Sequence, residues 1–409
     1  MSLRICMIGQ RGVPATFGGI EHHVEELGSR LAACGHEVNV FCRSSYVPDA
    51  RREHLGMTLH YVPTLKTKHM EAITHSALST LAAMADHPGI IHYHGVGPAL
   101  VAPLPRYLAR AKIVATVHAL DADRTKWGWS ARQALRAGSW LCARVPDATI
   151  AVSRAIAEHY QQRYRRNVAY IPNGVTPRGR PGAREIVQRF GLHPGAYVLF
   201  VGRLVPEKAP DLLIRAFRRL PGDDIRLVLA GGSSFTDDYV RTLQAAAASD
   251  PRVTLTGYVY GPLLEELYAN AAAFVLPSVV EGLPLTLLEA VSYGTPVVAS
   301  RIPPHVEILG SGGGGGGIGG SGSPGGRLFP PGDEAALSET LARVLRDPGC
   351  ERRGADRLRE RVLGRYSWKS ALAATMSVYE EVLASHVRVP AAPADPRAGA
   401  ARELEHTDT

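Results

Sequence analysis

The stretch AYVLFVGRLVPEKAPDLL (residues 196–213) decides the fold class of this 409-residue chain. It joins a short, nearly continuous apolar run ending at Gly202 to a helical pattern, through a loop that carries Arg203 and Lys208. A strand that is apolar at almost every position is buried on both faces, which is typical of a parallel sheet with helices on either side. The stretch therefore predicts one strand–loop–helix unit of an α/β fold.

The same unit recurs along the chain in two series. We expect strands at residues 4–9, 37–42, 58–63, 89–94, 112–118, 148–152 and 167–172, and then at 196–202, 225–232, 252–257, 272–278 and 295–300. Helical patterns separate most of these runs, such as residues 21–34, which end just before Gly35 as helices often do. Two series predict two doubly wound, Rossmann-like α/β domains that face each other across a cleft, with ligands beyond the carboxyl ends of the strands.

The turn-rich segment IPNGVTPRGRPG (171–182) predicts the linker between the two domains. We therefore expect a first domain at residues 1–172 and a second at 173–365. The glycine-rich run at 310–326 is a low-complexity insert that cannot bury a core. Residues 385–409 have the Pro, Ala and charge content of a disordered tail.

Composition limits the class of protein and its partners. The chain has 46 basic and 38 acidic residues, a net charge of +8, and five scattered cysteines without a CxxC spacing. The cysteines argue for a reducing compartment and against a disulfide framework or a zinc site. With no secretory signal or membrane-spanning run, we expect a cytoplasmic protein. The charge suits nucleotides or a phospholipid surface, whereas nucleic acid is not expected because no basic, aromatic-interleaved patch occurs.

The stretch EGLPLTLLE (281–289) follows another predicted strand and carries a carboxylate at each end. A helix that starts near Pro284 leaves unpaired backbone N–H groups at its N-terminus, where an anion is stabilised. Glu289 comes more than one turn into this helix, and a carboxylate accepts two hydrogen bonds from a vicinal diol such as a ribose. The alternative is that Glu281 only complements the helix dipole and that Glu289 is an exposed helical residue.

Arg203 and Lys208 lie where another strand ends, before a helix. Two cations beside a helix N-terminus favour a diphosphate site. The alternative is a pair of solvated surface charges.

These motifs resemble the nucleotide-binding half of the GT-B glycosyltransferases of family 4, also called glycosyltransferase group 1. The resemblance rests on GRLVPEK (202–208) and EGLPLTLLEA (281–290), whose two glutamates have seven residues between them. Four further stretches match in order: AVSRAIAEHY (151–160), IPNGV (171–175), LTGYV (255–259) and SYGTPVVAS (292–300). The stretches at 9–27 and 117–128 further resemble a bacterial subgroup that includes rhamnosyl- and other cell-surface polysaccharide transferases.

The resemblance implies a nucleoside diphosphate sugar as co-substrate, with no separate cofactor. It implies that Arg203 and Lys208 contact the diphosphate of this donor and that Glu289 holds its ribose. The donor sugar would contact the first motif glutamate and the residues that follow it, namely Glu281, Gly282, Leu283, Pro284 and Leu285.

Other positions are implied in the same way. The tandem glycines Gly18 and Gly19 would approach the diphosphate or the acceptor, and His118 would contact the donor sugar. The base would lie near the TGYV loop, at Tyr258 and Val259. The final helical segment, residues 366–384, would cross back onto the first domain.

The expected reaction is the retaining transfer of a sugar to a hydroxyl acceptor, which is a glycan, a lipid-linked compound or a small molecule. His118 and Glu281 are the expected catalytic positions. One alternative is a nucleotide-sugar 2-epimerase of the same architecture, which would turn over the donor without an acceptor. Another is a non-catalytic nucleotide-sugar-binding subunit, which would bind without turnover.

No metal site is predicted. The Asp-Ala-Asp triplet at 121–123 resembles a metal-binding DxD, but this spacing is common and GT-B enzymes typically need no such metal. The histidines of EHH (21–23) and HYH (92–94) lack a convincing third ligand, and we interpret them as hydrogen-bonded structural groups.

One basic helical face remains. Arg132, Arg136 and Arg144 flank Trp140 at helical spacing. They are interpreted either as a solvated face or as a surface that meets anionic lipid at the inner face of the membrane.

Overall fold

The computed structural model describes residues 2–16, 18–46, 51–64, 70–120, 129–232, 237–310 and 322–385. Most of the glycine-rich run, the tail beyond Ser385 and the Asp-Ala-Asp triplet lie outside the described residues. Predictions about those segments stay predictions.

The first domain is built on a sheet with the strand order β3-β4-β2-β1-β5-β6-β7-β8. Its strands are β1 (Arg4–Ile8), β2 (Glu37–Arg43), β3 (Glu53–His54), β4 (Met57–Val62), β5 (Ile90–His94), β6 (Lys112–Val117), β7 (Ala148–Ala151) and β8 (Ala169–Tyr170). The helices are α1 (Gly19–Ala33), α2 (Met70–Ala85), η1 (Pro98–Val101), α3 (Pro103–Leu108), α4 (Trp129–Arg144) and α5 (Arg154–Tyr164). All neighbouring strands run parallel except β3 and β4.

The second domain repeats this plan with the strand order β11-β10-β9-β12-β13-β15-β14. Its strands are β9 (Tyr197–Val201), β10 (Arg226–Ala230), β11 (Val253–Gly257), β12 (Ala273–Leu276), β13 (Val297–Ser300), β14 (Gly322–Ser323) and β15 (Gly326–Phe329). The helices are α6 (Glu185–Phe190), η3 (Pro206–Lys208), α7 (Pro210–Arg218), α8 (Asp237–Ala248), α9 (Gly261–Asn270), α10 (Leu285–Ser292), α11 (Pro303–Leu309), α12 (Glu334–Arg346) and α13 (Pro348–Arg365). Only β14 and β15 pair antiparallel among these strands.

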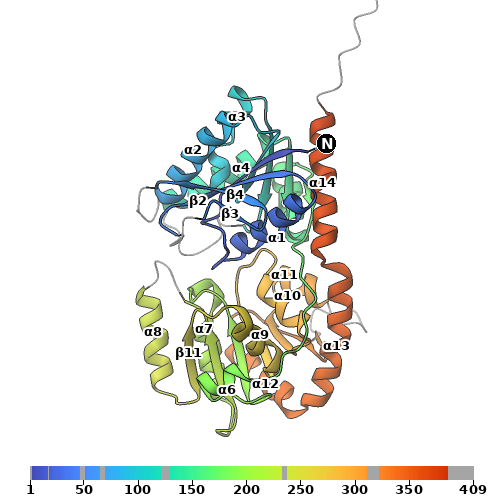
Figure 1. The fold of residues 1–409 in the computed structure, drawn as a ribbon. Helices are drawn as coiled ribbons and strands as arrows, with labels where there is room; N and C mark the ends of the chain where they lie inside the picture. Colours follow the sequence, from blue (N-terminus) through green and yellow to red (C-terminus); the bar gives the residue numbers. More distant parts are fainter. Residues whose placement is uncertain are drawn as a thin grey trace, which may run out of the picture.

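The central strands are buried along their whole length, because helices cover both faces of each sheet. Every residue of β5, β6, β12 and β13 is buried. The predicted fold class, two doubly wound domains, is therefore confirmed, and Figure 1 shows them stacked one above the other. The bounds predicted for each domain stay predictions.

The sequence did not predict three strands, β3, β14 and β15. The omission of β15 matters most, because it pairs with β13 and extends the second sheet. Its four residues, Gly-Arg-Leu-Phe, lie between Gly325 and Pro330, so the segment resembles a turn in sequence and becomes a strand through its tertiary neighbour.

The last helix, α14 (Trp368–Ala384), leaves the second domain and runs along the first (Figure 1). It packs against α1 and β6, and the buried Tyr379 hydroxyl lies 2.7 Å from His92 Nδ1. Where the chain crosses between the domains, the N–H of Val175 donates to the carbonyl of Tyr366 at 2.9 Å, so the two crossing segments are joined. Among the described residues, no helix combines the length and apolarity needed to cross a membrane.

Candidate active site

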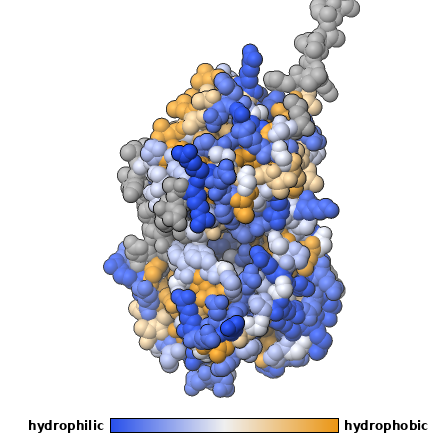
Figure 2. Space-filling model, viewed as in Figure 1, coloured by the Kyte–Doolittle hydropathy of each residue, from blue (hydrophilic) through white to orange (hydrophobic). Residues whose placement is uncertain are grey.

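A cleft of about 400 Å³ lies between the domains, at the carboxyl ends of both sheets. Figure 2 shows a recess at this place. The residues predicted for the site all line this cleft: Gly18, Gly19, His118, Arg203, Lys208, Tyr258, Val259, Glu281, Gly282, Leu283, Pro284, Leu285 and Glu289. The structure thus brings together positions from five separate parts of the sequence, and the role of each stays a prediction.

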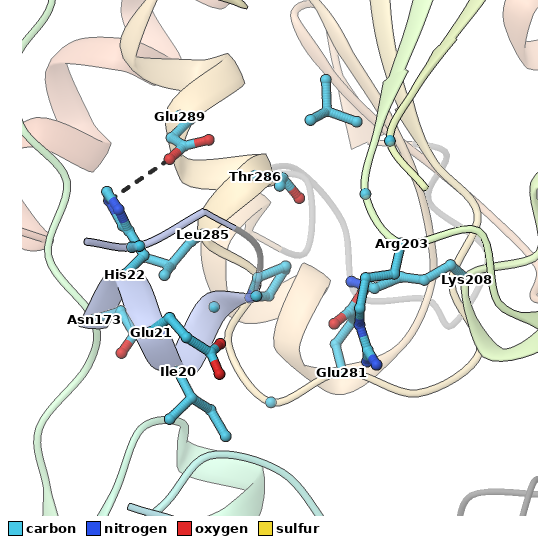
Figure 3. Close-up of a pocket in the computed structure, with 18 of the residues that line it drawn as sticks. Ile20, Glu21, His22, Asn173, Arg203, Lys208, Glu281, Leu285, Thr286 and Glu289 are labelled. Atoms are coloured by element: carbon cyan, nitrogen blue, oxygen red, sulfur yellow. Dashed lines mark hydrogen bonds and ion pairs between the residues drawn. The ribbon is translucent and has the colours of Figure 1, made fainter. Parts of the chain in front are cut away.

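Lys208 and Glu281 form the charged centre of the second-domain side. Arg203 follows β9, Lys208 ends the short helix η3, and Glu281 lies in the loop between β12 and α10. The ammonium group of Lys208 donates to Glu281 Oε1, and the two side chains are only 14% and 9% exposed. Figure 3 shows Arg203 beside this pair.

The Lys208–Glu281 pair keeps the carboxylate ionised. Burial alone would raise the pKa of Glu281, but Lys208, and to a smaller degree His305, outweigh burial and lower it. A buried carboxylate that stays negative can accept hydrogen bonds from sugar hydroxyls, and it holds the lysine in place. The alternative interpretation of Glu281 as a residue that only complements the helix dipole does not account for this buried ion pair.

The helix α10 starts at Leu285, with Pro284 as its N-cap residue, so the proline precedes the first turn. Thr286, in that first turn, lines the cleft, and its hydroxyl is buried without a hydrogen-bond partner among the described residues. Buried hydroxyls are normally paired, so an unpaired one beside a helix N-terminus points to an anionic ligand. Sequence reasoning considered only the backbone N–H groups at this helix start and missed the Thr286 side chain, although its hydroxyl was an available signal.

Glu289 lies one turn further along α10 and faces the first domain. Its Oε2 accepts a hydrogen bond from the Tyr268 hydroxyl at 3.0 Å, and its Oε1 lies 3.8 Å from Nε2 of His22 on α1 (Figure 3). Burial raises the pKa of Glu289, against the opposing effect of His22. The alternative interpretation as an exposed helical glutamate is therefore wrong.

A pair of tyrosines forms the wall of the cleft farther along the second sheet. The rings of Tyr258 and Tyr260 are stacked, with centroids 6.1 Å apart and an interplanar angle of 10°. Tyr258 is 40% exposed, and together with Val259 it borders the cleft. A half-exposed aromatic face suits the stacking of a nucleotide base.

The first domain presents the start of α1 to the cleft. Gly18 is the N-cap residue of this helix and has a φ of 104°, a backbone conformation that residues with a side chain rarely adopt. Glu21, in the first turn, accepts a hydrogen bond from the backbone N–H of Arg11 at 2.9 Å. This carboxylate fixes the loop that precedes α1, and it too lines the cleft.

The two domains touch at the floor of the cleft. A Cβ atom added to Gly282 would lie 2.7 Å from the carbonyl carbon of His118, so only glycine allows the two backbones to approach this closely. Nearby, the Asn173 side chain donates to the carbonyl oxygen of Leu283 at 3.0 Å. These contacts describe a closed arrangement of the cleft. Asn173 and His22 also line the cleft. Sequence reasoning placed them within IPNGV and EHH but gave neither a role in the site, because each acquires its place through a contact with the other domain.

Three histidines meet behind the cleft: His23 from α1, His94 at the end of β5, and His118 just after β6. Each offers a ring nitrogen, and these nitrogens lie within 4.8 Å of one another. The expectation that the EHH and HYH histidines lack a third partner is therefore wrong. It failed because β5 and β6 are adjacent parallel strands, whose ends share one edge of the sheet. Within the described part of the chain, this is the one group placed to hold a metal ion.

Comparison with known proteins agrees with this geometry. Residues 184–361 match the family model described as glycosyl transferases group 1, and residues 17–178 match the one described as glycosyltransferase family 4. The chain belongs to the group 1 glycosyltransferases. The two matches lie on the two domains of this glycosyltransferase.

Relatives extend over nearly its whole length. Glycogen synthase of Mycobacterium tuberculosis is 28% identical over 413 residues, which cover 92% of this chain and 94% of that protein. Among solved structures, sucrose-phosphate synthase from Thermosynechococcus elongatus has a TM-score of 0.78 at 24% identity, covering 94% of this glycosyltransferase and 100% of that chain. HepE of Anabaena, in complex with UDP and glucose, has a TM-score of 0.76 at 19% identity, and the match covers 93% of this glycosyltransferase and 100% of the HepE chain. These structures confirm the predicted GT-B fold.

Proposed function

We propose that the protein transfers a sugar from a nucleoside diphosphate sugar to a hydroxyl acceptor, with retention of the anomeric configuration and without a metal ion at the diphosphate. The observation that carries this proposal is the buried Lys208–Glu281 pair beside Arg203 and the unpaired Thr286 hydroxyl. Together they offer cations and hydrogen-bond donors for a diphosphate, and a carboxylate for a sugar, in one cleft.

The base, ribose and diphosphate of the donor each contact a different part of the cleft. Its base stacks on Tyr258, beside Val259. Its ribose hydroxyls donate hydrogen bonds to the carboxylate of Glu289 and take the place of the 3.8 Å contact with His22. Its diphosphate meets Arg203 and Lys208. In this arrangement the sugar lies between the two domains.

The sugar is held from both sides. Glu281 and the backbone after it, Gly282 to Leu285, contact it from the second domain, and His118 contacts it from the first. Gly18 and Gly19, at the start of α1, leave room for the diphosphate or for the acceptor to approach. Closure of the cleft around the bound substrates would exclude water and favour transfer over hydrolysis.

Positive charge supplied by the protein replaces a metal ion in stabilising the leaving group. As the sugar–phosphate bond breaks, negative charge develops on the departing diphosphate, and Arg203, Lys208 and the N–H groups at the start of α10 stabilise it. The departing phosphate oxygen takes the proton of the attacking hydroxyl. No protein nucleophile is assigned, since Glu281 is already paired with Lys208.

Thermal stabilisation by nucleotides tests the donor site. A panel of nucleoside diphosphates and their sugars, uridine compounds first because HepE carries UDP, is compared on wild type, Arg203→Ala and Glu289→Ala. Since a ligand that binds only the folded state raises the melting temperature, one nucleotide family should stabilise the wild type and neither variant. No stabilisation by any nucleotide would refute the proposal.

Product analysis then decides the reaction. Turnover of the donor without an acceptor would indicate a nucleotide-sugar 2-epimerase, and binding without any turnover would indicate a non-catalytic subunit. NMR spectroscopy of the anomeric proton in the product tests retention. Equal rates with and without a chelator test metal independence.

We also propose that the first domain contacts an anionic membrane. Figure 2 shows apolar side chains gathered over α2 and α3, and five large ones are exposed there: Ile73, Leu78, Leu81, Tyr107 and Leu108. The helices α2, α3 and α4 all pack against η1, so this patch adjoins α4, where Arg136, Arg144 and Trp140 are exposed. Apolar side chains beside arginines are the composition of a membrane-surface site.

Co-sedimentation with vesicles of anionic and of neutral lipid tests this contact. The variant Arg132→Glu/Arg136→Glu/Arg144→Glu should lose binding to anionic vesicles, and Leu78→Ser/Leu81→Ser should weaken it. Leu55→Ser is the control, because Leu55 is 61% exposed but lies on the β3–β4 turn. Equal binding by all four proteins would refute the contact.

A further inference from the structure

His118 is the one member of the three-histidine cluster that lines the cleft. Its chemistry there depends on which ring nitrogen carries the proton, because a neutral imidazole donates through one nitrogen and accepts through the other. The hydrogen-bond partners of the cluster decide this, and the deduction starts at His23.

The proton of His23 is on Nδ1. This nitrogen lies 2.9 Å from Asn173 Oδ1, while the amide nitrogen of Asn173 donates to the carbonyl oxygen of Leu283 at 3.0 Å. Because the Asn173 oxygen can only accept, His23 Nδ1 must donate. Nε2 of His23 is then a bare nitrogen, and it is buried without a partner among the described residues.

The same reasoning fixes His94. Its Nδ1 lies 3.3 Å from Nε2 of His118, and its own Nε2 is buried without a described partner. If the proton were on Nε2, a buried N–H would be left unpaired, which is rarer and costlier than an unpaired acceptor. The proton therefore lies on Nδ1, and His94 donates to Nε2 of His118.

His94 also has little freedom to turn. Its ring lies on that of His92, with centroids 4.2 Å apart. His92 is itself held at both nitrogens, by Tyr379 of α14 and by Thr116 of β6, each at 2.7 Å. The orientation of His94 is thus fixed by the strand beside it and by the last helix of the chain.

We propose that His94 is a positioning residue that locks His118 in the Nδ1–H tautomer, so that His118 presents a hydrogen-bond donor to the substrate in the cleft. His118 then recognises an oxygen lone pair of the donor sugar and does not serve as a general base. This inference rests on the proposed sugar transfer, and it narrows the role of His118 within it.

The neutral state of the cluster supports the lock. Burial, together with His23 and His92, holds the pKa of His118 well below its ordinary range, and burial lowers the pKa of His23 to about 4. Burial, together with His92, His23 and His118, also holds the pKa of His94 well below its ordinary range. All three rings are therefore neutral at physiological pH, and each carries a single N–H.

The test uses full-length protein labelled with ¹⁵N-histidine. The ring nitrogens of His118 are assigned by their loss in His118→Gln, and protonated and bare nitrogens have well separated chemical shifts. The wild type should show a protonated Nδ1 and a bare Nε2 at His118. In His94→Leu the proton should redistribute to Nε2.

Kinetics with matched variants complete the test. His94→Asn keeps an amide N–H near the position of Nδ1 and should retain most activity, whereas His94→Leu should lower kcat by about tenfold, the value of one hydrogen bond. His75→Asn is the control for folding, because His75 is also fully buried, beside the Ser79 hydroxyl, but lies outside the cluster.

Three results would overturn the inference. They are a wild-type His118 protonated on Nε2, equal activity of His94→Asn and His94→Leu, or one Zn²⁺ bound per wild-type chain and lost in His94→Leu. The last would assign the bare nitrogens to a metal ion. If the wild type transfers no sugar at all, the proposed function fails, and the NMR spectrum still decides the tautomer.

Discussion

Replacing Gly282 by alanine should uncouple donor binding from sugar transfer. The added Cβ would lie 2.7 Å from the carbonyl carbon of His118 in the facing domain. The Cβ would also overlap the carbonyl oxygen of His118, which is its nearest neighbour. Non-bonded heavy atoms approach one another to about 3–3.5 Å without repulsion, so the two backbones must separate by at least about 1 Å. Both sides of the contact are backbone, and neither can rotate away.

A separation of this size acts on the reaction because His118 and Glu281 hold the sugar from opposite sides. Misplacement by about 1 Å can cost about a hundredfold in rate. We therefore expect Gly282→Ala to lower kcat about a hundredfold. The affinity for the nucleoside diphosphate should change little, because its base, ribose and diphosphate contacts lie on the second domain.

The assay is steady-state transfer combined with a thermal melt and a binding titration. The melting temperature should fall by no more than about 5 °C, because overpacking at one buried position costs about 1–3 kcal/mol. Gly364→Ala is the control, since a Cβ added at Gly364, in α13, meets no atom within 4 Å. If Gly282→Ala transfers sugar at the rate of Gly364→Ala, the close approach of the domains is not needed for transfer.

Four more variants test the charged and polar groups of the cleft. Lys208→Met should destabilise the fold by about 3–5 kcal/mol at pH 7, as measured by denaturant unfolding, because it leaves the buried Glu281 carboxylate unpaired. The pKa of Glu281 is lowered in the folded state, so the stability from this pair is present at neutral pH and is lost as the pH falls below about 4.3. In the double variant Lys208→Met/Glu281→Gln the free energy of unfolding should therefore fall less steeply with decreasing pH than in the wild type. An equal pH dependence of the two proteins would contradict the pairing. Thr286→Val should weaken nucleoside diphosphate binding about tenfold in a calorimetric titration while leaving the melting temperature equal or higher, since it removes a buried unpaired hydroxyl; unchanged affinity would exclude the contact. Glu289→Gln should raise the melting temperature at pH 7, because the raised pKa means that burial disfavours the charged form, and it should lower donor affinity; a lower melting temperature would show that the charge is stabilising.

Much of the cleft could be predicted from sequence because strand ends mark it. Arg203 and Glu281 each follow an apolar strand, and the carboxyl ends of parallel strands meet at one edge of a sheet. The sequence could therefore place both on the same side of the second domain without any knowledge of side-chain contacts.

What the sequence could not supply were relations across the cleft. His22 and Asn173 belong to the first domain and to the linker, and each acquires its place from a contact with the other domain, at Glu289 and Leu283. The histidine cluster could not be predicted from the sequence for a related reason. His94 and His118 lie 24 residues apart along the chain, and only the strand order β5-β6 makes them neighbours.

The return of α14 to the first domain has a consequence for biosynthesis. The strands of that domain leave the ribosome first, but the helix that covers α1 and β6 and that pairs Tyr379 with His92 is made last. At about 5–20 residues per second, the roughly 200 intervening residues take about 10–40 s to synthesise. During that time a nascent chain carries an uncovered apolar face, so the first domain completes its folding only after the second has been made.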